Sequence, residues 1–329
     1  MSNTIRNKYK YPGVIFLIIL VPGILLTLNP LRSVSKDEDR PLTEPKKSYA
    51  IFPVEIPEAI EFAGEKVPVD QIDISEALDR EILVNTYWQS QTLLFLKRAN
   101  RYFPTIEKIL KKYNIPDDFK YLAVAESGLM NVVSPAHAVG FWQLLKGTAM
   151  EYGLEVNSEV DERYHLEKST EAACKYILDS YKKYNSWTLA AASYNAGRRG
   201  VDRQIARQLD SDYFDLLFTE ETSRYLFRIL AIKLIISSPG DYGFYIGKND
   251  LYHEIPSFEV TIDGKVDKLA EFAKRYHITY KTLKRMNPWL RESSLSNPKN
   301  KSYFVKIPRK GYFDPTRAEF NTQNPEVAN

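Results

Sequence analysis

The residues best placed to do chemistry in this sequence lie at 121–128, where an apolar stretch runs into a carboxylate. Phe119, Leu122 and Ala123 precede Glu126 by seven, four and three residues, which puts all four on one face of a helix. Glu126 is then in line with the stripe that faces the core. Gly128 is suited to end that helix in a left-handed turn. The stretch therefore predicts a helix-end carboxylate at the edge of a hydrophobic core.

A carboxylate in this position is pushed toward its protonated form. Burial can raise a carboxyl pKa by about 3–5 units, whereas the negative end of the helix dipole contributes only roughly 0.3–1 kcal/mol. Desolvation must therefore supply most of any rise in the pKa of Glu126. A Glu that stays protonated near neutral pH is what a general acid requires. A Glu at the rim, with its head in water, is the competing interpretation, because ionisable groups are seldom fully buried without partners.

Helical periodicity dominates residues 76–248 and predicts an all-α domain. The expected helices cover about 76–84, 87–99, 102–113, 117–127, 143–152, 169–184, 187–195 and 220–236. Residues 249–312 differ, because two alternating stretches, around Val260 and Val305, flank two short helical stripes. This pattern predicts the order strand, helix, helix, strand. The expected fold class is mainly α, with a small βααβ domain after the helical one.

The N-terminal segment indicates export. Residues 1–31 combine three early cations with an apolar run from Val14 to Leu28, which predicts either a signal peptide or a membrane anchor. Residues 32–75 are charged and rich in proline, and are expected to form a linker. Residues 313–329 are expected to be a disordered tail. The rest of the chain is therefore expected to be exported, either free or anchored to a membrane and facing away from the cytoplasm.

The overall composition excludes several functional classes. The chain has 329 residues, of which 44% are hydrophobic and 26% charged, and its formal net charge is +3. These values suit one to three globular units and are too balanced for a nucleic-acid-binding protein. Cys174 is the single cysteine, so no disulfide can form within the chain, and the four histidines are scattered. We therefore expect no metal site and no cofactor.

Four separated motifs, at residues 126–129, 134–143, 192–197 and 221–225, complete the candidate site. In this order and spacing they resemble the lytic transglycosylases of glycoside hydrolase family 23. The resemblance implies a lysozyme-like α-helical fold. It also implies cleavage of the β-1,4 bond between N-acetylmuramic acid and N-acetylglucosamine in peptidoglycan, with a 1,6-anhydro product made without water. Glu126 matches the family's single catalytic acid/base. The supporting or substrate-binding positions that the resemblance implies are Ser127, Ser134, Gln143, Tyr194, Asn195, Glu221 and Tyr225.

The chemistry of a single carboxylate agrees with such a product. An ordinary glycosidase uses two carboxylates, and Glu126 has no companion inside its own motif. One carboxyl group suffices if it first protonates the leaving oxygen and then takes a proton from the sugar's C6 hydroxyl, while the substrate's acetamido group stabilises the cation. Tyr194 offers a hydroxyl that could hold the acetamido oxygen or steer Glu126. Glu221 stands at a helix start, which favours its ionised form, and suits an electrostatic partner.

The sequence departs from the family pattern after Glu126. The loop to Ser134 looks one residue shorter than usual, His137 stands where Gly is typical, and Lys146 with Gly147 replaces a Met/Pro-type pair. These differences concern loop shape, and so the preference for saccharide length and peptide stem. Residues 249–312 resemble, more loosely, the LysM module that binds glycans containing N-acetylglucosamine.

Two other functions stay compatible with the sequence. A hydrolytic muramidase would need a second carboxylate that faces Glu126 across the cleft. A non-catalytic cell-wall scaffold would bind glycan through the same fold, and the intact set of Glu126, Gln143 and Tyr194 argues against it. Peptidoglycan strands are the expected partner in each case. The membrane is a further partner if the N-terminal segment stays uncleaved, and no nucleic acid is expected.

Overall fold

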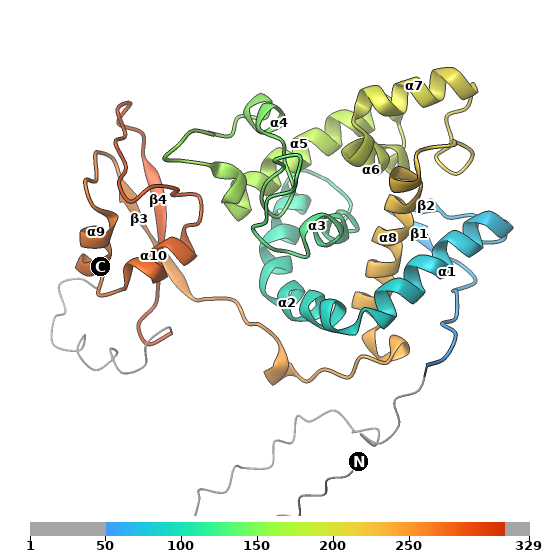
Figure 1. Ribbon diagram of the computed structural model, residues 1–329, viewed down its shortest axis with the longest axis horizontal. Helices are drawn as coiled ribbons and strands as arrows, with labels where there is room; N and C mark the ends of the chain where they lie inside the picture. The colour runs from blue at the N-terminus through green and yellow to red at the C-terminus, as the bar shows by residue number, and fades with distance from the viewer. Residues whose placement is uncertain (1–50, 313–329) are drawn as a thin grey trace, which may run out of the picture. The chain divides into compact units, whose positions relative to one another are not determined.

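The computed structural model describes residues 51–312, so the signal peptide or anchor expected at 1–31 and the tail expected at 313–329 lie outside the described residues. None of the helices in the described range combines the length and the apolarity that crossing a bilayer requires. The helices are α1 (Ile72–Tyr87), α2 (Gln89–Lys112), α3 (Phe119–Ser127), α4 (Lys146–Glu151), α5 (Leu166–Tyr184), α6 (Trp187–Ala196), α7 (Arg198–Gln208), α8 (Glu220–Ser237), α9 (Leu269–Arg275) and α10 (Tyr280–Met286) (Figure 1). The strands are β1 (Glu61–Phe62), β2 (Glu65–Lys66), β3 (Ser257–Ile262) and β4 (Tyr303–Pro308), and short 3₁₀ turns are η1 (Glu162–Tyr164), η2 (Pro239–Tyr242) and η3 (Lys248–Asp250).

Helix α3 is the buried centre of the helical part. Its residues from Phe119 to Val124 are all buried, and it packs against α2 and α8 (Figure 1). A helix that is buried on nearly every side is stable only when other elements enclose it. The neighbouring helices therefore fix α3 from several sides, and with it any side chain that leaves its last turn.

Helices α2 and α7 depart most clearly from the expected set. The expected helices 87–99 and 102–113 form one helix, α2, because its buried stripe of Phe95, Ala99 and Phe103 continues through Pro104. The loss of one backbone hydrogen bond at that proline is offset by this packing. Helix α7 was not expected. Val201 is its one buried residue, so the apolar period that would reveal the helix is almost absent from its sequence.

The structure corrects the linker assignment for residues 51–75. Val54, Ile60, Phe62 and Val67 are buried in the helical core, and α1 already begins at Ile72. The rings of Phe62 and Phe119 lie 5.1 Å apart. The apolar residues of this segment follow neither a helical nor a strand period, and the prolines around them suggest a tether, so the sequence pattern is misleading here. The rest of the expected linker, 32–50, lies outside the described residues.

The same N-terminal segment supports α6. The carboxylate of Glu65 accepts hydrogen bonds from the backbone N–H groups of Trp187 and Thr188, the latter at 2.9 Å, and from the hydroxyl of Ser186 at 3.2 Å. Unpaired N–H groups and a partial positive charge at a helix N-terminus attract an anion. Glu65 therefore caps α6 from a residue more than 120 positions earlier in the chain.

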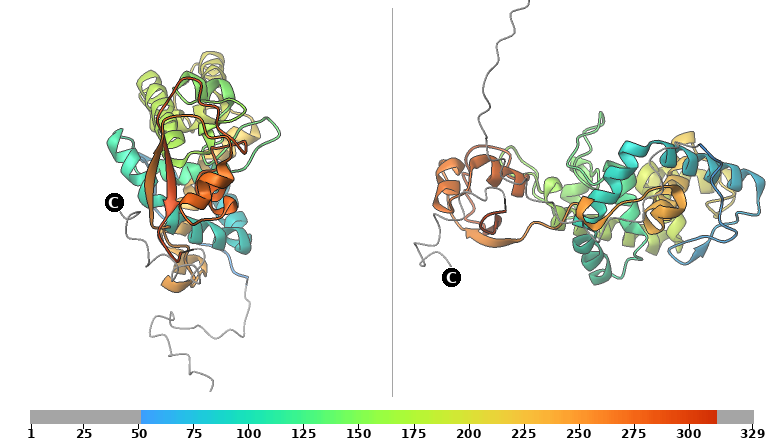
Figure 2. Two further views of the ribbon diagram at one scale, coloured as in Figure 1. Left: turned by 90° about the vertical axis from the view of Figure 1, so that its left-hand side faces the viewer. Right: turned by 90° about the horizontal axis from the view of Figure 1, so that it is seen from below.

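The C-terminal residues fold in the expected order of strand, helix, helix and strand. Strands β3 and β4 pair antiparallel, from Ser257 opposite Pro308 to Ile262 opposite Tyr303. Helices α9 and α10 lie on one face of this pair (Figure 2). Leu269 and Leu283 of these helices and Val305 of β4 are fully buried between them. The side chain of Thr279 caps α10 by accepting from the N–H of Thr282 at 3.0 Å.

Candidate active site

Glu126 lies in the last turn of α3, at the edge of the core. Phe119, Leu122 and Ala123 on the same face are fully buried, whereas Glu126 is partly accessible. Gly128 follows at φ 60°, in the left-handed conformation that the sequence predicts. The carboxyl group therefore leaves the helix where the core meets the surface. That position lets protein atoms displace much of its water and still leaves the group within reach of a substrate.

Helix α8 presents three side chains that act on Glu126. Glu221, Tyr225 and Arg228 are spaced by four and three residues, so they share one face of the helix. The hydroxyl of Tyr225 donates a hydrogen bond to Oε1 of Glu126. The charges of Arg228 and Glu221 also influence the carboxyl group. Tyr225 is thus the direct partner of the candidate acid.

Desolvation raises the pKa of Glu126 to about 7, as the sequence predicts for a carboxyl group at the edge of the core. The hydrogen bond from Tyr225 and the positive charge of Arg228 oppose this rise, and the negative charge of Glu221 adds to it. Both protonation states of Glu126 are therefore populated near neutral pH. A group with such a pKa can release a proton and recover one, which suits a general acid that later acts as a base.

Tyr194, on α6, is a second hydroxyl close enough for the charge of Glu126 to act on it. It donates to the carbonyl of Trp142 at 2.7 Å. Desolvation and the negative charge of Glu126 raise the pKa of both Tyr194 and Tyr225 well above the usual value, so both remain neutral donors. The indole of Trp142 is fully buried and donates to Thr170 at 2.8 Å. Trp142 is therefore a core residue that anchors Tyr194.

The two predicted serines hold the backbone after α3. Ser127 is buried, and its hydroxyl donates to the carbonyl of Phe141 at 2.8 Å. The hydroxyl of Ser134 accepts from the N–H of Ala138 at 3.0 Å. Both serines therefore shape residues 131–144, which we call the 131–144 loop. Direct contact of either hydroxyl with a sugar stays a prediction.

Gln143 also belongs to this loop. The sequence pattern predicts it as the start of a helix, but the structure places it in a turn before α4, with φ at 45°. Its amide Nε2 donates to the carbonyls of Gly140 and Val132 at 2.8 and 3.1 Å. The NH₂ group of Gln143 is thus used to hold the loop together. Binding of Gln143 to a sugar amide stays a prediction.

Asn195 and Glu221 are brought together at the junction of α6 and α8. The amide Nδ2 of Asn195 donates to Oε1 of Glu221 at 3.3 Å, and its Oδ1 accepts from the hydroxyl of Thr222 at 2.9 Å. Glu221 is exposed. Asn195 therefore ties the end of the helix that carries Tyr194 to the start of the helix that carries Tyr225.

Sequence reasoning missed a charged group behind this site. Glu81 of α1 is 1% exposed and pairs with Arg224 at 2.7 Å and with Arg228 at 3.9 Å. Arg228 could have been found, because it lies three residues after Tyr225 on the same helical face. Glu81 could not, because no motif surrounds it and a carboxylate on a helix is normally read as exposed.

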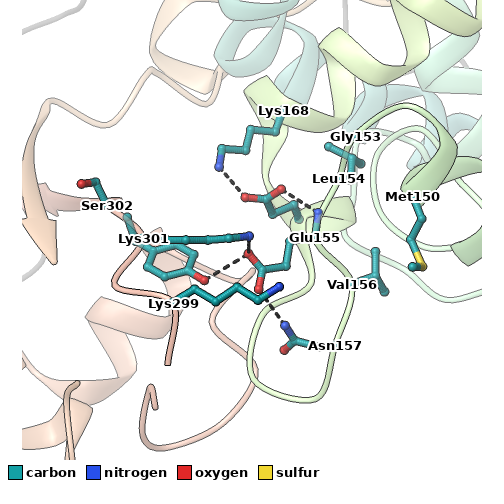
Figure 3. Close-up of a pocket in the computed structure, with 12 residues that line it drawn as sticks. Met150, Gly153, Leu154, Glu155, Val156, Asn157, Lys168, Lys299, Lys301 and Ser302 are labelled. Atoms are coloured by element: carbon teal, nitrogen blue, oxygen red, sulfur yellow. Dashed lines mark hydrogen bonds and ion pairs between the residues drawn. The ribbon is translucent and has the colours of Figure 1, made fainter. Parts of the chain in front are cut away.

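A cavity of about 570 Å³ is lined by none of these residues (Figure 3). Its lining residues are Met150, Gly153, Leu154, Glu155, Val156, Asn157, Glu162, Lys168, Lys299, Lys301, Ser302 and Tyr303. Lys301 points toward Glu155 and pairs with it at 2.8 Å, and Lys168 pairs with Glu162 (Figure 3). These charged groups satisfy one another, so this cavity does not compete with the surroundings of Glu126 as the candidate active site.

Comparisons with known families agree with this geometry. The family described as "Transglycosylase SLT domain" matches residues 104–216, which include Glu126, Gln143 and Tyr194. The family described as "Soluble lytic transglycosylase C-terminal LysM-like domain" matches residues 258–311. Glu221 and Tyr225 lie beyond the first match. Their link to the site comes from the hydrogen bonds described above.

Curated relatives show the same pattern. The chain is 28% identical over 221 residues to "Membrane-bound lytic murein transglycosylase D" of Escherichia coli (strain K12), which covers 65% of this chain and 47% of the relative. It is 29% identical over 111 residues to "Putative tributyltin chloride resistance protein" of Alteromonas sp. (strain M-1), over 33% of this chain and 54% of the relative. The chain thus spans about half the length of the curated relatives it matches. Residues 104–216 are therefore a transglycosylase SLT domain with a lysozyme-like helical fold, and residues 258–311 are a LysM-like domain.

Proposed function

We propose that this protein is a peptidoglycan lytic transglycosylase that cleaves the β-1,4 bond between N-acetylmuramic acid and N-acetylglucosamine and leaves 1,6-anhydro ends. The observation that carries the proposal is the carboxyl group of Glu126, whose pKa desolvation raises to about 7, bonded to Tyr225 and placed in an SLT domain. The names of the Escherichia coli relatives, which describe lytic murein transglycosylases, support the same substrate class.

The proposed reaction needs one carboxyl group and no water. Protonated Glu126 gives its proton to the glycosidic oxygen as the bond from that oxygen to C1 of muramic acid breaks, and the bonding electrons leave with the oxygen. The acetamido group of the substrate stabilises the cation at C1. The carboxylate of Glu126 then takes the proton of the C6 hydroxyl while O6 bonds to C1. Glu126 ends as it began, protonated, and the donor from Tyr225 steadies its charged form in between.

The proposal also covers location and glycan binding. The cations before the apolar run at 14–28 and the membrane-bound description of the relative support a site of action outside the cytoplasm. We place the enzyme in the periplasm, free or held at a membrane by its N-terminal segment. We assign glycan binding to the LysM-like domain on the basis of its family match alone.

Product analysis in heavy-oxygen water tests the reaction type. Purified peptidoglycan is digested with the wild-type protein in water labelled at oxygen, and the fragments are analysed by mass spectrometry. The expected muramic acid ends lack the elements of one water and carry no label, because O6 of the sugar itself closes the ring. A parallel digest with a hydrolytic lysozyme gives labelled, hydrated ends and checks the assay.

Labelled ends from the wild-type protein would replace the proposal with a hydrolytic muramidase. Glu221 is the specific reason to keep that second candidate in view, since its negative charge acts on Glu126 and a second carboxylate is what hydrolysis with two acids needs. Binding to peptidoglycan with no released fragment would instead favour a non-catalytic scaffold.

Tyr225→Phe should move the pH dependence of cleavage. In the wild-type protein the hydroxyl of Tyr225 stabilises the carboxylate form of Glu126 and so lowers its pKa. The variant lacks this hydroxyl, so the pKa of Glu126 should rise further above about 7. Protonated Glu126 is the form that starts the reaction, so kcat/KM falls as pH rises through this pKa. The falling limb should therefore shift to higher pH in the variant. We expect the maximal rate to drop by about 10- to 100-fold, since a hydrogen bond to a charged group contributes about 1.5–3 kcal/mol.

Tyr213→Phe is the matched control. Tyr213 is also a buried tyrosine that binds α8, but its hydroxyl donates to the carbonyls of Thr222 and Ser223 at 3.0 Å. This variant removes a buried hydroxyl without touching Glu126. An unchanged pH profile in Tyr225→Phe, or an equal shift in Tyr213→Phe, would contradict the direct action of Tyr225 on Glu126.

A further inference from the structure

A short segment, residues 155–167, separates the SLT domain's loop from the LysM-like domain and contacts both. On the LysM-like side, the N–H of Asp161 donates to the carbonyl of Trp289 at 2.9 Å, and the N–H of Arg291 donates to the carbonyl of Glu159 at 2.7 Å. These bonds join the two segments of the chain as in neighbouring antiparallel strands, around a bridge between Val160 and Leu290. The LysM-like domain is therefore docked through its backbone.

Three acidic side chains of the segment strengthen this docking. Glu155 pairs with Lys301 at 2.8 Å and accepts from Tyr303 at 3.0 Å. Glu159 accepts from Ser296, at 2.5 Å from the hydroxyl and 3.0 Å from the N–H. Glu167 pairs with Lys306 of the LysM-like domain. Desolvation opposes ionisation of Glu167, but the hydrogen bond with His165 and the charge of Lys306 lower the pKa of this carboxyl group to about 2. Each of these carboxylates thus has a hydrogen-bond or ion-pair partner on the LysM-like domain. We call these contacts the seam.

On its other side, the segment holds the 131–144 loop through Arg163. The guanidinium of Arg163 is bound by both carboxylate oxygens of Asp161, at 2.9 and 2.8 Å. Its remaining N–H group donates to the loop carbonyls of His137 at 3.1 Å and Leu144 at 3.3 Å. Both Asp161 and Arg163 are buried. A planar guanidinium fixed on two oxygens presents its other donors in a set direction, so Arg163 determines where the loop lies.

Apolar packing follows the same route. Val139 of the loop, Val160 and Tyr164 of the segment, and Trp289 and Leu290 of the LysM-like domain are buried in one continuous cluster. The guanidinium of Arg291 also lies 3.9 Å from the centre of the Tyr164 ring. The loop, the segment and the LysM-like domain therefore share a hydrophobic core. A shift of the LysM-like domain would open this core on the side where the loop is packed.

We propose that the LysM-like domain acts as a brace that positions the 131–144 loop of the candidate active site, with Arg163 as the positioning residue. The loop contains Gln143 and the carbonyl of Trp142 that anchors Tyr194, so its placement sets the surroundings of Glu126. The loop placement itself stands on contacts alone. Its effect on cleavage rests on the proposed function.

Hydrogen exchange of the full chain tests the brace without any assumption about activity. Lys301→Met with Lys306→Met removes two cations of the seam, while Lys274→Met with Lys281→Met removes two exposed lysines of α9 and α10 as a matched control. Arg163→Lys removes the planar fork. We expect amide exchange within residues 131–144 to become several-fold faster in the seam variant and about tenfold faster in Arg163→Lys, and to stay unchanged in the control.

Cleavage of a short soluble glycan and of intact sacculi gives the second readout. If the LysM-like domain is a brace, the seam variant and Arg163→Lys both lower kcat on both substrates, by about tenfold in Arg163→Lys, at temperatures well below unfolding of either protein. If the domain only retained glycan, the seam variant would lower activity on sacculi alone. Unchanged exchange in residues 131–144, or a loss confined to sacculi, overturns the brace. If the wild-type protein cleaves neither substrate, the proposed function fails and the exchange experiment still decides whether the brace exists.

Discussion

Glu126→Gln is expected to abolish peptidoglycan cleavage, with a fall in kcat of at least about 1,000-fold. A carboxamide keeps the size of the side chain and can still accept the hydrogen bond from Tyr225, but it can neither give a proton to the leaving oxygen nor take one from the C6 hydroxyl. General acid and base catalysis typically contributes about 10²–10⁴-fold for each role. Release of soluble fragments from sacculi measures the effect.

Glu221→Gln is the control for this substitution. It removes a carboxylate whose charge also acts on Glu126, but one that is exposed and bound to Asn195. We expect this variant to keep most of its activity if one carboxyl group does the chemistry. Full activity of Glu126→Gln would reject the assignment of the acid. Equal losses in both variants would instead point to a pair of carboxylates.

The same Glu126→Gln variant should be more stable than the wild type at alkaline pH. The pKa of Glu126 is about 7 in the folded protein, against an ordinary value of 4.5, so the unfolded chain releases this proton first. The wild-type protein therefore loses stability as pH rises from about 4.5 to 7, and the loss is complete above that range. At about 1.4 kcal/mol per pKa unit, we expect the variant to gain roughly 1–3 kcal/mol.

Urea unfolding of both proteins at about pH 4 and pH 8 tests this expectation. Below the ordinary carboxyl pKa, Glu126 is protonated in both the folded and the unfolded chain, so the free energies of unfolding should converge. Above about pH 7, the pKa of Glu126 in the folded protein, the free energies of unfolding of the two proteins should differ most. A variant that is inactive and less stable at alkaline pH would mean that Glu126 is held in its charged form by favourable contacts.

Gly140→Ala is expected to cause the second large effect, through the 131–144 loop. Gly140 has a φ of 84°, and a Cβ atom added there would lie 2.1 Å from the carbonyl oxygen of Arg163. The backbone of one partner must move, because neither a carbonyl oxygen nor a loop glycine has side-chain freedom that could relieve the contact. We expect the free energy of unfolding to fall by about 2–4 kcal/mol. Activity should fall by about 100-fold, since the loop anchors Tyr194 and carries Gln143.

Two other glycines separate the causes of this effect. Gly153→Ala places a side chain at φ 90° with nothing within 4 Å of the new Cβ, so it should cost only about 1 kcal/mol of backbone strain. Gly147→Ala, in α4 and equally open, should be neutral or slightly stabilising. A cost for Gly140→Ala no larger than that for Gly153→Ala would show that the loop can move away from Arg163 freely.

Much of the helix that carries Glu126 could be predicted because local pattern and tertiary structure agree there. The apolar face before Glu126, the left-handed Gly128 and the dominance of desolvation in its pKa all follow from residues within one short stretch. The βααβ order after residue 249 was predictable for the same reason. Each strand alternates, and Thr279 marks the start of the second helix.

The supporting residues were predicted less completely, because their roles depend on partners far away in sequence. Ser127, Ser134 and Gln143 could be placed near the acid by their motifs, but their hydrogen bonds to backbone groups follow from the path of the loop. Arg163 and Glu81 belong to no motif. Their charges are buried only because Asp161, Arg224 and the loop carbonyls meet them in the folded protein.

The cap that Glu65 forms at the N-terminus of α6 has a consequence for proteolytic trimming of the N-terminal segment. The helix it caps carries Tyr194 in its last turns. A protease that trimmed the chain back to residue 70 would remove that anion together with the buried ring of Phe62, and would uncover the core beneath Phe119. Trimming at a place remote from Glu126 in the sequence would thus loosen α6, the helix whose Tyr194 hydroxyl lies near Glu126. Among the described residues, Val54 is the first buried side chain in chain order, so any trimming that leaves this support intact would have to stop before it.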